Sequence, residues 1–132
     1  MTTLEPFSAL LNLLEEKDPH GLDQNAPGAK LDSGKTMPWL CIAGFSRALE
    51  EVAKVTTLGA RKYTPNGWAS VPEGTTRYME AFGRHLLKLG QGELKDTGPN
   101  GLGDVYHISQ CIWNLLAAHE LQLRDLDSQK NI

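Results

Sequence analysis

Apolar residues recur every three or four positions along most of this chain, which is the spacing of one face of an α-helix. Runs of alternating β-branched residues, the usual mark of strands, do not stand out. The pattern predicts helices joined by Gly/Pro-rich loops, at about residues 5–16, 38–58, 75–89 and 102–124. We therefore expect an all-α fold, a small helical bundle with long loops, followed by a polar tail at 125–132 that frays.

Each predicted helix has an apolar face that should be buried. In the last helix this face consists of Val105, Ile108, Ile112, Leu115, Leu116 and Leu123. Gly59 is the expected end of the second helix. Gly83 falls in the middle of the third, where glycine costs about 1 kcal/mol relative to alanine. A close backbone approach to another helix or to a ligand would explain this glycine.

Two loops carry candidate substrate-binding groups. The loop at about 17–37 is long for a small domain, and such loops are often functional. It places Lys30, Asp32 and Lys35 among glycines, without the spacing of a P-loop. Its lysines can contact phosphates as point charges, and a flexible solvated loop is the alternative.

The second loop, at about 59–68, combines cations, aromatic rings and an amide. Lys62 stands next to Tyr63, and Asn66 and Trp68 follow. An aromatic ring here can stack on a nucleotide base, and the amide can hydrogen-bond the edge of the base. The alternative is that the rings cover the hydrophobic core.

Composition narrows the class of protein. A length of 132 residues with 40% hydrophobic and 22% charged residues is ordinary for one domain, 1–132, and excludes a disordered chain or a disulfide scaffold. A net charge of -3 argues against sequence-independent nucleic-acid binding. No membrane span or signal peptide is recognised, so we expect a cytoplasmic location. Cys41 and Cys111 are expected to be reduced core thiols.

One acidic residue stands out on each of three predicted helices. Glu51 has small and apolar neighbours on its face, where a carboxylate is unfavourable unless it is paired or metal-bound. Glu80 precedes Arg84 by four residues, and Asp104 lies in the first turn of the last helix, with His107 three residues on. The alternatives are a solvated Glu51, a Glu80–Arg84 surface ion pair, and an Asp104 that stabilises the helix dipole.

Two neighbours of these acids complete the set of candidates. Glu50 precedes Lys54 by four residues, which suits an exposed ion pair. His85 borders the apolar face of its helix, and we interpret it as a residue at the edge of the core rather than as a ligand. Hard divalent cations prefer carboxylate oxygens, so three converging acids would suit Mg²⁺ together with a phosphorylated substrate.

Together these segments resemble a known family, the phage dATP/dGTP diphosphohydrolases. These are MazZ-like members of the MazG-type all-α nucleoside triphosphate pyrophosphohydrolases, and the likeness covers about residues 28–120. It rests on the runs Lys30-x-Asp32-x-Gly34-Lys35, Leu49-x-Glu51-Val52-Ala53-x-Val55, Gly59-Ala60-x-Lys62-Tyr63, Asn66-x-Trp68 and Arg84-His85-Leu86.

The resemblance implies hydrolysis of dATP and dGTP to the monophosphate and pyrophosphate. It also implies more than one divalent ion per site, Mg²⁺ or Mn²⁺ with Co²⁺ as a further option. The enzyme would be a homodimer or homotetramer with sites near subunit contacts, working in the host cytoplasm if the chain is viral.

The chain departs from the family pattern at its acidic motifs. MazG-type enzymes carry Glu-x-x-Glu on one helix and Glu-x-x-Asp on the next. Here Lys54 and Gly83 stand where further acids would, and Gly101 stands where the Glu of a Glu-Leu-Gly-Asp run would. A literal Glu93-x-x-Asp96 occurs, but in the Gly-rich loop.

We therefore expect Glu51, Glu80 and Asp104 to be catalytic and to bind the metal, with Glu50 as a fourth ligand and Asp96 as the next choice. A second group would balance the charge of the triphosphate: Lys30, Lys35, Lys62 and Arg84. A third would lie near the sugar, base or phosphates: Asp32, Tyr63, Asn66, Trp68 and His107. The alternative functions are a MazG-type housecleaning pyrophosphatase for another nucleotide and a non-catalytic helical adaptor.

Overall fold

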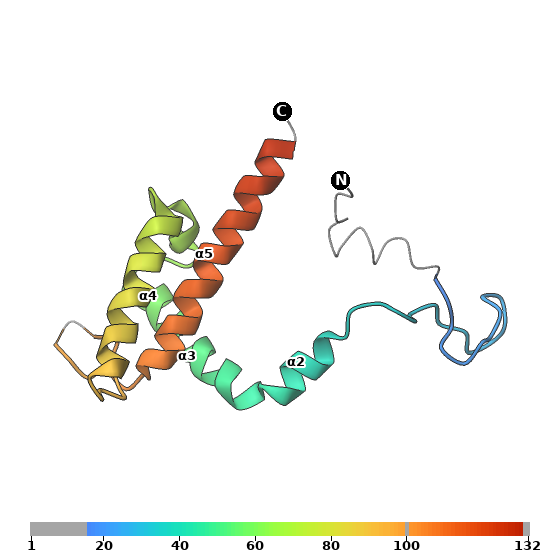
Figure 1. Ribbon diagram of the computed structural model, residues 1–132, viewed down its shortest axis with the longest axis horizontal. Coiled ribbons are helices and arrows are strands. Elements are labelled where there is room, and N and C mark those ends of the chain that lie inside the picture. The colour runs from blue at the N-terminus through green and yellow to red at the C-terminus, as the bar shows by residue number, and fades with distance from the viewer. Residues whose placement is uncertain (1–15, 100, 131–132) are drawn as a thin grey trace, which may run out of the picture. The chain divides into compact units, whose positions relative to one another are not determined.

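The computed structural model describes residues 16–99 and 101–130 (Figure 1). The chain divides into two compact units, with the boundary between Gly44 and Phe45. The first predicted helix, at about 5–16, lies outside the described residues except for Glu16, which is not helical.

The first unit consists of a loop followed by a short helix, α2 (Pro38–Gly44). Asp18 organises the loop. Its Oδ1 accepts hydrogen bonds from the backbone N–H groups of His20 at 2.7 Å and Leu22 at 3.3 Å, and its Oδ2 accepts one from Lys30 at 2.9 Å. The bond from Lys30 contributes most to lowering the pKa of the Asp18 carboxyl, because it stabilises the charged form.

The second predicted helix is two helices rather than one. α2 ends at Gly44, Phe45 has non-helical angles (φ -117°, ψ 24°), and α3 runs over Ser46–Lys62. The prediction that Gly59 ends the helix is also wrong. Gly59 stays helical, and its carbonyl oxygen accepts the backbone N–H of Tyr63, where the helical geometry stops.

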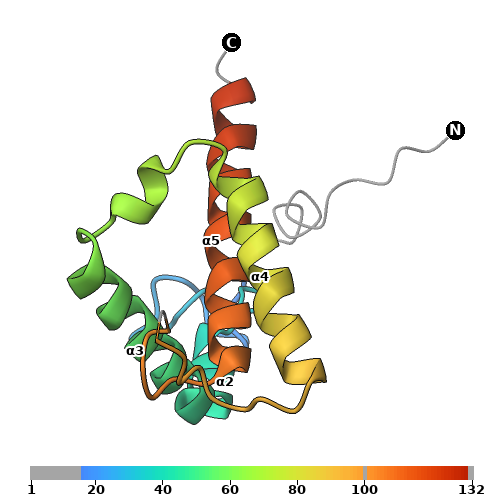
Figure 2. The same cartoon turned by 90° about the vertical axis from the view of Figure 1, so that its left-hand side faces the viewer.

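The second unit is built from helices, which confirms the expected small all-α bundle. It contains α3, the 3₁₀ turn η1 (Gly67–Ser70), α4 (Gly74–Gly90) and α5 (His107–Lys130). α4 and α5 run side by side in opposite directions, as both views show, and α3 packs against α5 (Figures 1 and 2). In the part of the chain described, the pairing of Lys95 with Tyr106 is an isolated antiparallel bridge.

The apolar face predicted for the last helix is only partly buried. Val105 is buried and Ile112 is half-buried, as expected. Ile108, Leu116 and Leu123 are 54%, 52% and 43% exposed, and Leu115 is exposed too, although all four were expected in the core. The buried face is small and polar instead, and consists of His107, Ser109, Gln110, Cys111, Asn114, Ala117 and Ala118. The sequence pattern is ambiguous here because both faces of α5 follow helical spacing, and only packing against α3 and α4 decides between them.

The bounds of α5 also differ from the prediction. The helix begins at His107 rather than near Leu102, because the preceding residues pair with the end of the previous loop. The backbone N–H of Asp96 donates to the carbonyl of Val105 at 2.8 Å, and that of His107 donates to Leu94 at 3.0 Å. Asp104 therefore lies in a loop and not in the first helical turn. At its other end α5 continues beyond the expected end at Arg124, to Lys130.

Two smaller expectations concern Gly83 and the cysteines. A Cβ atom added to Gly83 would meet nothing within 4 Å, so no other helix of the described chain approaches this glycine closely, and the approach of a ligand stays a prediction. Cys111 is buried as expected, but Cys41 is exposed. Among the described helices, none is long and apolar enough to cross a membrane.

Candidate functional site

The second unit contains a cavity of about 720 Å³ between α3, η1, α4 and α5. This volume suits a drug-sized or nucleotide-sized ligand. The cavity is rich in aromatic side chains, contributed by Tyr63, Trp68, Tyr78 and Trp113. Its polar groups include the two amides Asn66 and Asn114 and the charged side chains Arg77, Glu80 and Arg84. It can therefore accept a flat aromatic ring together with an anionic group.

Trp113 on α5 is the centre of the aromatic wall. Its ring meets that of Tyr78 edge to face, with centroids 5.5 Å apart, and that of Trp68 with centroids 6.4 Å apart. Tyr78 also ties η1 to α4, because its hydroxyl donates to the carbonyl oxygen of Trp68 at 2.8 Å. Edge-to-face contacts and this hydrogen bond fix the rings in place.

Several residues predicted from the sequence share this cavity. Tyr63, Asn66, Trp68, Glu80 and Arg84 line it. The i,i+4 ion pair between Glu80 and Arg84 does not form between these two described side chains, so both charges remain free for a ligand. Lys62 lies outside the lining, with its ammonium 5.4 Å from the centroid of the Tyr63 ring.

The structure places Glu51 and Asp104 away from this lining, each beside a lysine. Lys54 Nζ donates to Glu51 at 2.7 Å, and Lys95 Nζ donates to Asp104 at 2.6 Å. The Glu51 hydrogen bond raises the pKa of Lys54, and the Lys95 ammonium lowers the pKa of Asp104.

The two ion pairs are neighbours. The charge of Asp104 adds to the rise in the pKa of Lys54, and that of Glu51 adds to the rise in the pKa of Lys95, whose largest cause is its hydrogen bond with Asp104. Glu50 is exposed and also acts on Lys54. Two of the predicted metal ligands, Glu51 and Asp104, therefore share one cluster of alternating charge, while Glu80 faces the cavity.

Three further predicted residues, Lys30, Asp32 and Lys35, belong to the first unit. Lys35 pairs with Glu16 at 3.7 Å, and the backbone of Lys30 is bound to Asp18. Asp32 accepts a backbone hydrogen bond from Lys35 at 3.1 Å, within a turn of the loop. These contacts define the local fold of the loop that carries the lysines.

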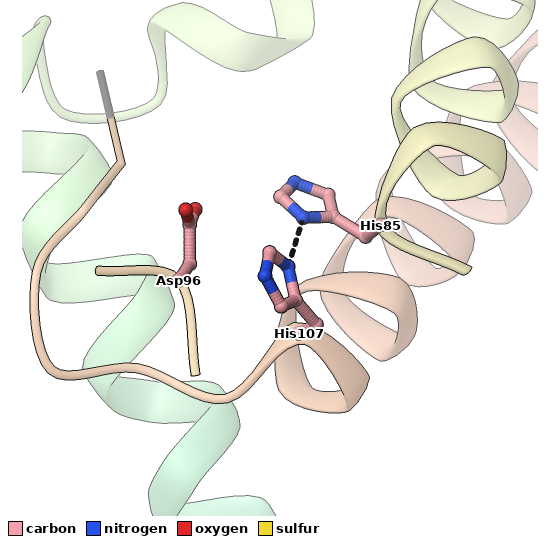
Figure 3. Close-up of side chains that lie close together, drawn as sticks. All are labelled: His85, Asp96 and His107. Atoms are coloured by element: carbon pink, nitrogen blue, oxygen red, sulfur yellow. Dashed lines mark hydrogen bonds between the residues drawn. The ribbon is translucent and has the colours of Figure 1, made fainter. Parts of the chain in front are cut away.

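A second group of polar side chains lies where α4, α5 and the loop between them meet. His85 on α4, Asp96 in the loop and His107 at the start of α5 each offer one ligand atom, and these atoms lie within 4.8 Å of one another (Figure 3). Nδ1 of His85 is 2.9 Å from Nδ1 of His107. Burial, the largest cause, lowers the pKa of His85, since it disfavours the imidazolium.

Two further residues hold this group in place. His107 Nε2 lies 3.2 Å from Glu93 Oε1, and Gln110 Nε2 donates to Asp96 Oδ2 at 2.7 Å. The sequence pattern places Asp96 last among the candidate acids and favours His85 as a residue at the edge of the core. The missed signal is that Arg84-His85, Glu93-x-x-Asp96 and His107 flank one helix–loop–helix turn, which brings them together.

A family model described as the N-terminal part of dATP/dGTP diphosphohydrolase matches residues 25–131, a range that includes both the cavity and the histidine group. Curated proteins and solved structures gave no significant match. The family match confirms the resemblance seen in the sequence motifs. The chain belongs to the dATP/dGTP diphosphohydrolase family, which comprises nucleoside triphosphate pyrophosphohydrolases.

Proposed function

We propose that this chain hydrolyses purine deoxynucleoside triphosphates, dATP and dGTP, to the monophosphate and pyrophosphate, with the base bound in the aromatic cavity. The observation that carries the proposal is the combination of stacking rings with free charges in one cavity. Trp68 and Trp113 offer faces and edges to a purine, and the amides of Asn66 and Asn114 offer donors and acceptors to its edge.

The charged residues of the cavity suit the triphosphate. Arg77 and Arg84 both line it from α4, and guanidinium groups bind phosphate oxygens through paired hydrogen bonds. In hydrolysis a water oxygen bonds to the α-phosphorus, the bond from that phosphorus to the bridging oxygen breaks, and pyrophosphate leaves. The two arginines would neutralise the charge that grows on the leaving group.

Glu80 is the base in this proposal. Its carboxylate lines the cavity and lacks the partner that Arg84 could have provided, so it can accept the proton of the attacking water. The proton is later released to solvent, and the carboxylate is regenerated. Divalent ions, Mg²⁺ or Mn²⁺, would shield the phosphate charges when bound. We keep Glu50, Glu51 and Asp104 as proposed ligands, although such ions would have to displace Lys54 and Lys95.

A nucleotide panel tests the proposal. The four deoxynucleoside triphosphates are incubated with the chain and Mg²⁺ or Mn²⁺, and pyrophosphate is separated from orthophosphate. We expect pyrophosphate from dATP and dGTP, and at least a tenfold lower kcat/KM for the pyrimidines. The proposed activity would be contradicted by release of orthophosphate alone, by equal use of pyrimidine nucleotides, or by no turnover at all.

Glu80→Gln tests the assignment of the base. We expect kcat to fall about 100-fold, the usual effect of losing a general base, with little change in KM. Glu120→Gln, an exposed change on α5, is the matched control and should leave turnover unchanged. Wild-type turnover in Glu80→Gln would remove this residue from the mechanism while leaving the activity itself intact.

We also propose that the chain forms a homo-oligomer through α5. Ile108, Leu116 and Leu123 recur at helical spacing and are 54%, 52% and 43% exposed. Exposed apolar side chains gathered on one side of a helix often mark a protein–protein contact. Light scattering after gel filtration should give a dimer or tetramer. Leu116→Glu should shift it to the monomer and Leu116→Met should not, whereas a monomeric wild type would contradict the proposal.

A further inference from the structure

We propose that His85, Asp96 and His107 bind one divalent transition-metal ion, at a site separate from the carboxylates Glu50, Glu51 and Asp104. The ion would be of the borderline class that imidazole favours, such as Zn²⁺, Co²⁺ or Ni²⁺, rather than Mg²⁺ or Ca²⁺. Two nitrogens and one carboxylate oxygen leave positions open for water or a substrate oxygen.

The spacing of the donor atoms fits a single ion. Two ligand atoms that are each about 2.1 Å from a metal lie about 3.0 Å apart at a right angle and about 3.4 Å apart in a tetrahedral site. The two Nδ1 atoms of His85 and His107 are 2.9 Å apart. Asp96 offers a carboxylate oxygen, and all the donor atoms lie within 4.8 Å of one another.

The arrangement around the ligands is that of a supported metal site. Glu93 Oε1 lies 3.2 Å from His107 Nε2, so the proton of this ring belongs on Nε2, and the Nδ1 lone pair faces the other ligands. Gln110 Nε2 donates to Oδ2 of Asp96 at 2.7 Å and so orients this carboxylate. A carboxylate behind a histidine ligand and a donor behind a carboxylate ligand are the usual outer partners of metal sites.

The three ligands are also held by rigid elements. His85 and His107 are on packed helices, and His107 is only 2% exposed. Asp96 lies on the loop, but its backbone N–H is bound to Val105 next to the bridge between Lys95 and Tyr106. A hydrogen bond between two neutral imidazoles would account for the contact between His85 and His107. It would not account for the position of Asp96 beside both rings, with Glu93 and Gln110 as outer partners.

The site lies near the proposed nucleotide cavity along both helices. Arg84 lines the cavity and is followed directly by His85. On α5, Asn114 lines the cavity and is seven residues, about 10.5 Å of helix, from His107. A nucleotide bound in the cavity would therefore extend its phosphates toward the metal. This last step rests on the proposed function, whereas the metal site itself does not.

Metal binding is measured directly on the purified full-length chain after treatment with a chelator. Co²⁺ is the probe, read by its visible absorption and by titration calorimetry. We expect a saturable site for one Co²⁺ per chain, displaced by Zn²⁺ and insensitive to excess Mg²⁺. Absence of a stoichiometric Co²⁺ spectrum would overturn the proposal.

Variants identify the ligands. His85→Gln and Asp96→Asn should each weaken Co²⁺ binding at least tenfold, and Glu93→Gln should weaken it about tenfold through His107. His119→Gln, an exposed histidine on α5, is the matched control and should bind as the wild type does. Circular dichroism checks that each variant is folded, which matters most for buried His107. Undiminished binding in both folded His85→Gln and folded Asp96→Asn would refute the ligand assignment.

The nucleotide panel, run in parallel, separates the two proposals. Co²⁺ binding without nucleotide hydrolysis would leave the metal site standing and remove the proposed function. Hydrolysis of purine nucleotides with Mg²⁺, by a chain that binds no Co²⁺, would support the proposed function and remove the metal site.

Discussion

His85 and His107 bring their Nδ1 atoms to 2.9 Å across the α4–α5 hairpin, although 22 residues separate them in the chain. The contact exists because α4 runs down to the loop and α5 runs back beside it, so the last turns of one helix meet the first residue of the other (Figure 2). The backbone pairing of residues 94–96 with 105–107 then places Asp96 beside both rings. The site thus depends on the loop geometry as much as on the helices.

Replacing Gly101 should disturb Asp96 specifically. An added Cβ would collide with the Asp96 carboxylate and come within 2.8 Å of its backbone carbonyl oxygen, so the loop has to shift. We expect Gly101→Ala to weaken Co²⁺ binding about tenfold, in the range seen when outer support of a ligand is lost. Gly98→Ala, where an added Cβ meets nothing within 4 Å, should bind as the wild type does. Equal affinities of the two variants would argue against Asp96 as a ligand.

Removing the hydroxyl of Tyr78 should loosen the wall of the cavity. Tyr78→Phe keeps the ring beside Trp113 but loses the 2.8 Å bond to the carbonyl of Trp68. We expect a loss of about 0.5–1.5 kcal/mol in the free energy of unfolding by urea, and a rise of a few-fold in KM for dGTP. Tyr106→Phe, whose ring contacts Lys95, is the control. A KM that rises equally in both variants would show that Tyr78 has no specific role.

The helices of the second unit could be predicted from the sequence because helical periodicity is a local property of the chain. Their ends could not. The start of α5 at His107 is set by hydrogen bonds to Leu94 and from Asp96, which are contacts between different parts of the chain. The buried face of α5 was missed for a related reason. Leucine spacing favours the face that carries Leu116, and packing selects the face that carries Asn114.

For the candidate sites too, local sequence predicts one part, and contacts between distant segments decide the other. Tyr63, Asn66 and Trp68 are close in sequence, so one loop motif predicts that they line one cavity. The histidine group comes from three separate segments, so the runs Arg84-His85-Leu86 and Glu93-x-x-Asp96 do not by themselves predict that its members meet. His85 was interpreted as a core residue because a single histidine on a helix face gives no sign of partners that arrive through tertiary structure.

Gly83→Ala should stabilise the protein. Gly83 lies in the middle of α4 with open space where its Cβ would be, so alanine gains helix propensity without a clash. We expect the free energy of unfolding by urea to rise by about 0.5–1 kcal/mol. At Gly74, by contrast, an added Cβ would come 2.7 Å from Leu121 Cδ1, and Gly74→Ala should destabilise. A destabilised Gly83→Ala would reveal a contact at this face that a single chain lacks.

The loop around Asp18 should open in acid. The folded pKa of Asp18 is below its ordinary value of 3.8, so the carboxylate stabilises the loop above about pH 4, and this contribution is lost as pH falls through the lower folded value. The amide resonances of His20 and Lys30 should move together in that range by NMR. Asp18→Asn should abolish the transition, and Asp23→Asn, which removes a carboxylate bound to one exposed amide only, should not. Amide shifts that titrate unchanged in Asp18→Asn would assign the transition to another group.

The lysine partners of Glu51 and Asp104 allow the carboxylates to be tested as metal ligands rather than as ion pairs. Both pairs are accessible to solvent, and exposed pairs contribute little to stability, so Glu51→Gln and Asp104→Asn should leave the melting temperature nearly unchanged. If the carboxylates bind the ions that accompany the substrate, both variants should lose at least tenfold in kcat with Mg²⁺. Lys54→Gln removes the same ion pair but frees Glu51, so it should keep the activity. Loss of activity in Lys54→Gln with full activity in Glu51→Gln would assign the role to the lysine, as a phosphate-binding cation. Full activity in all three variants would leave only the cavity and the histidine group as the catalytic centre.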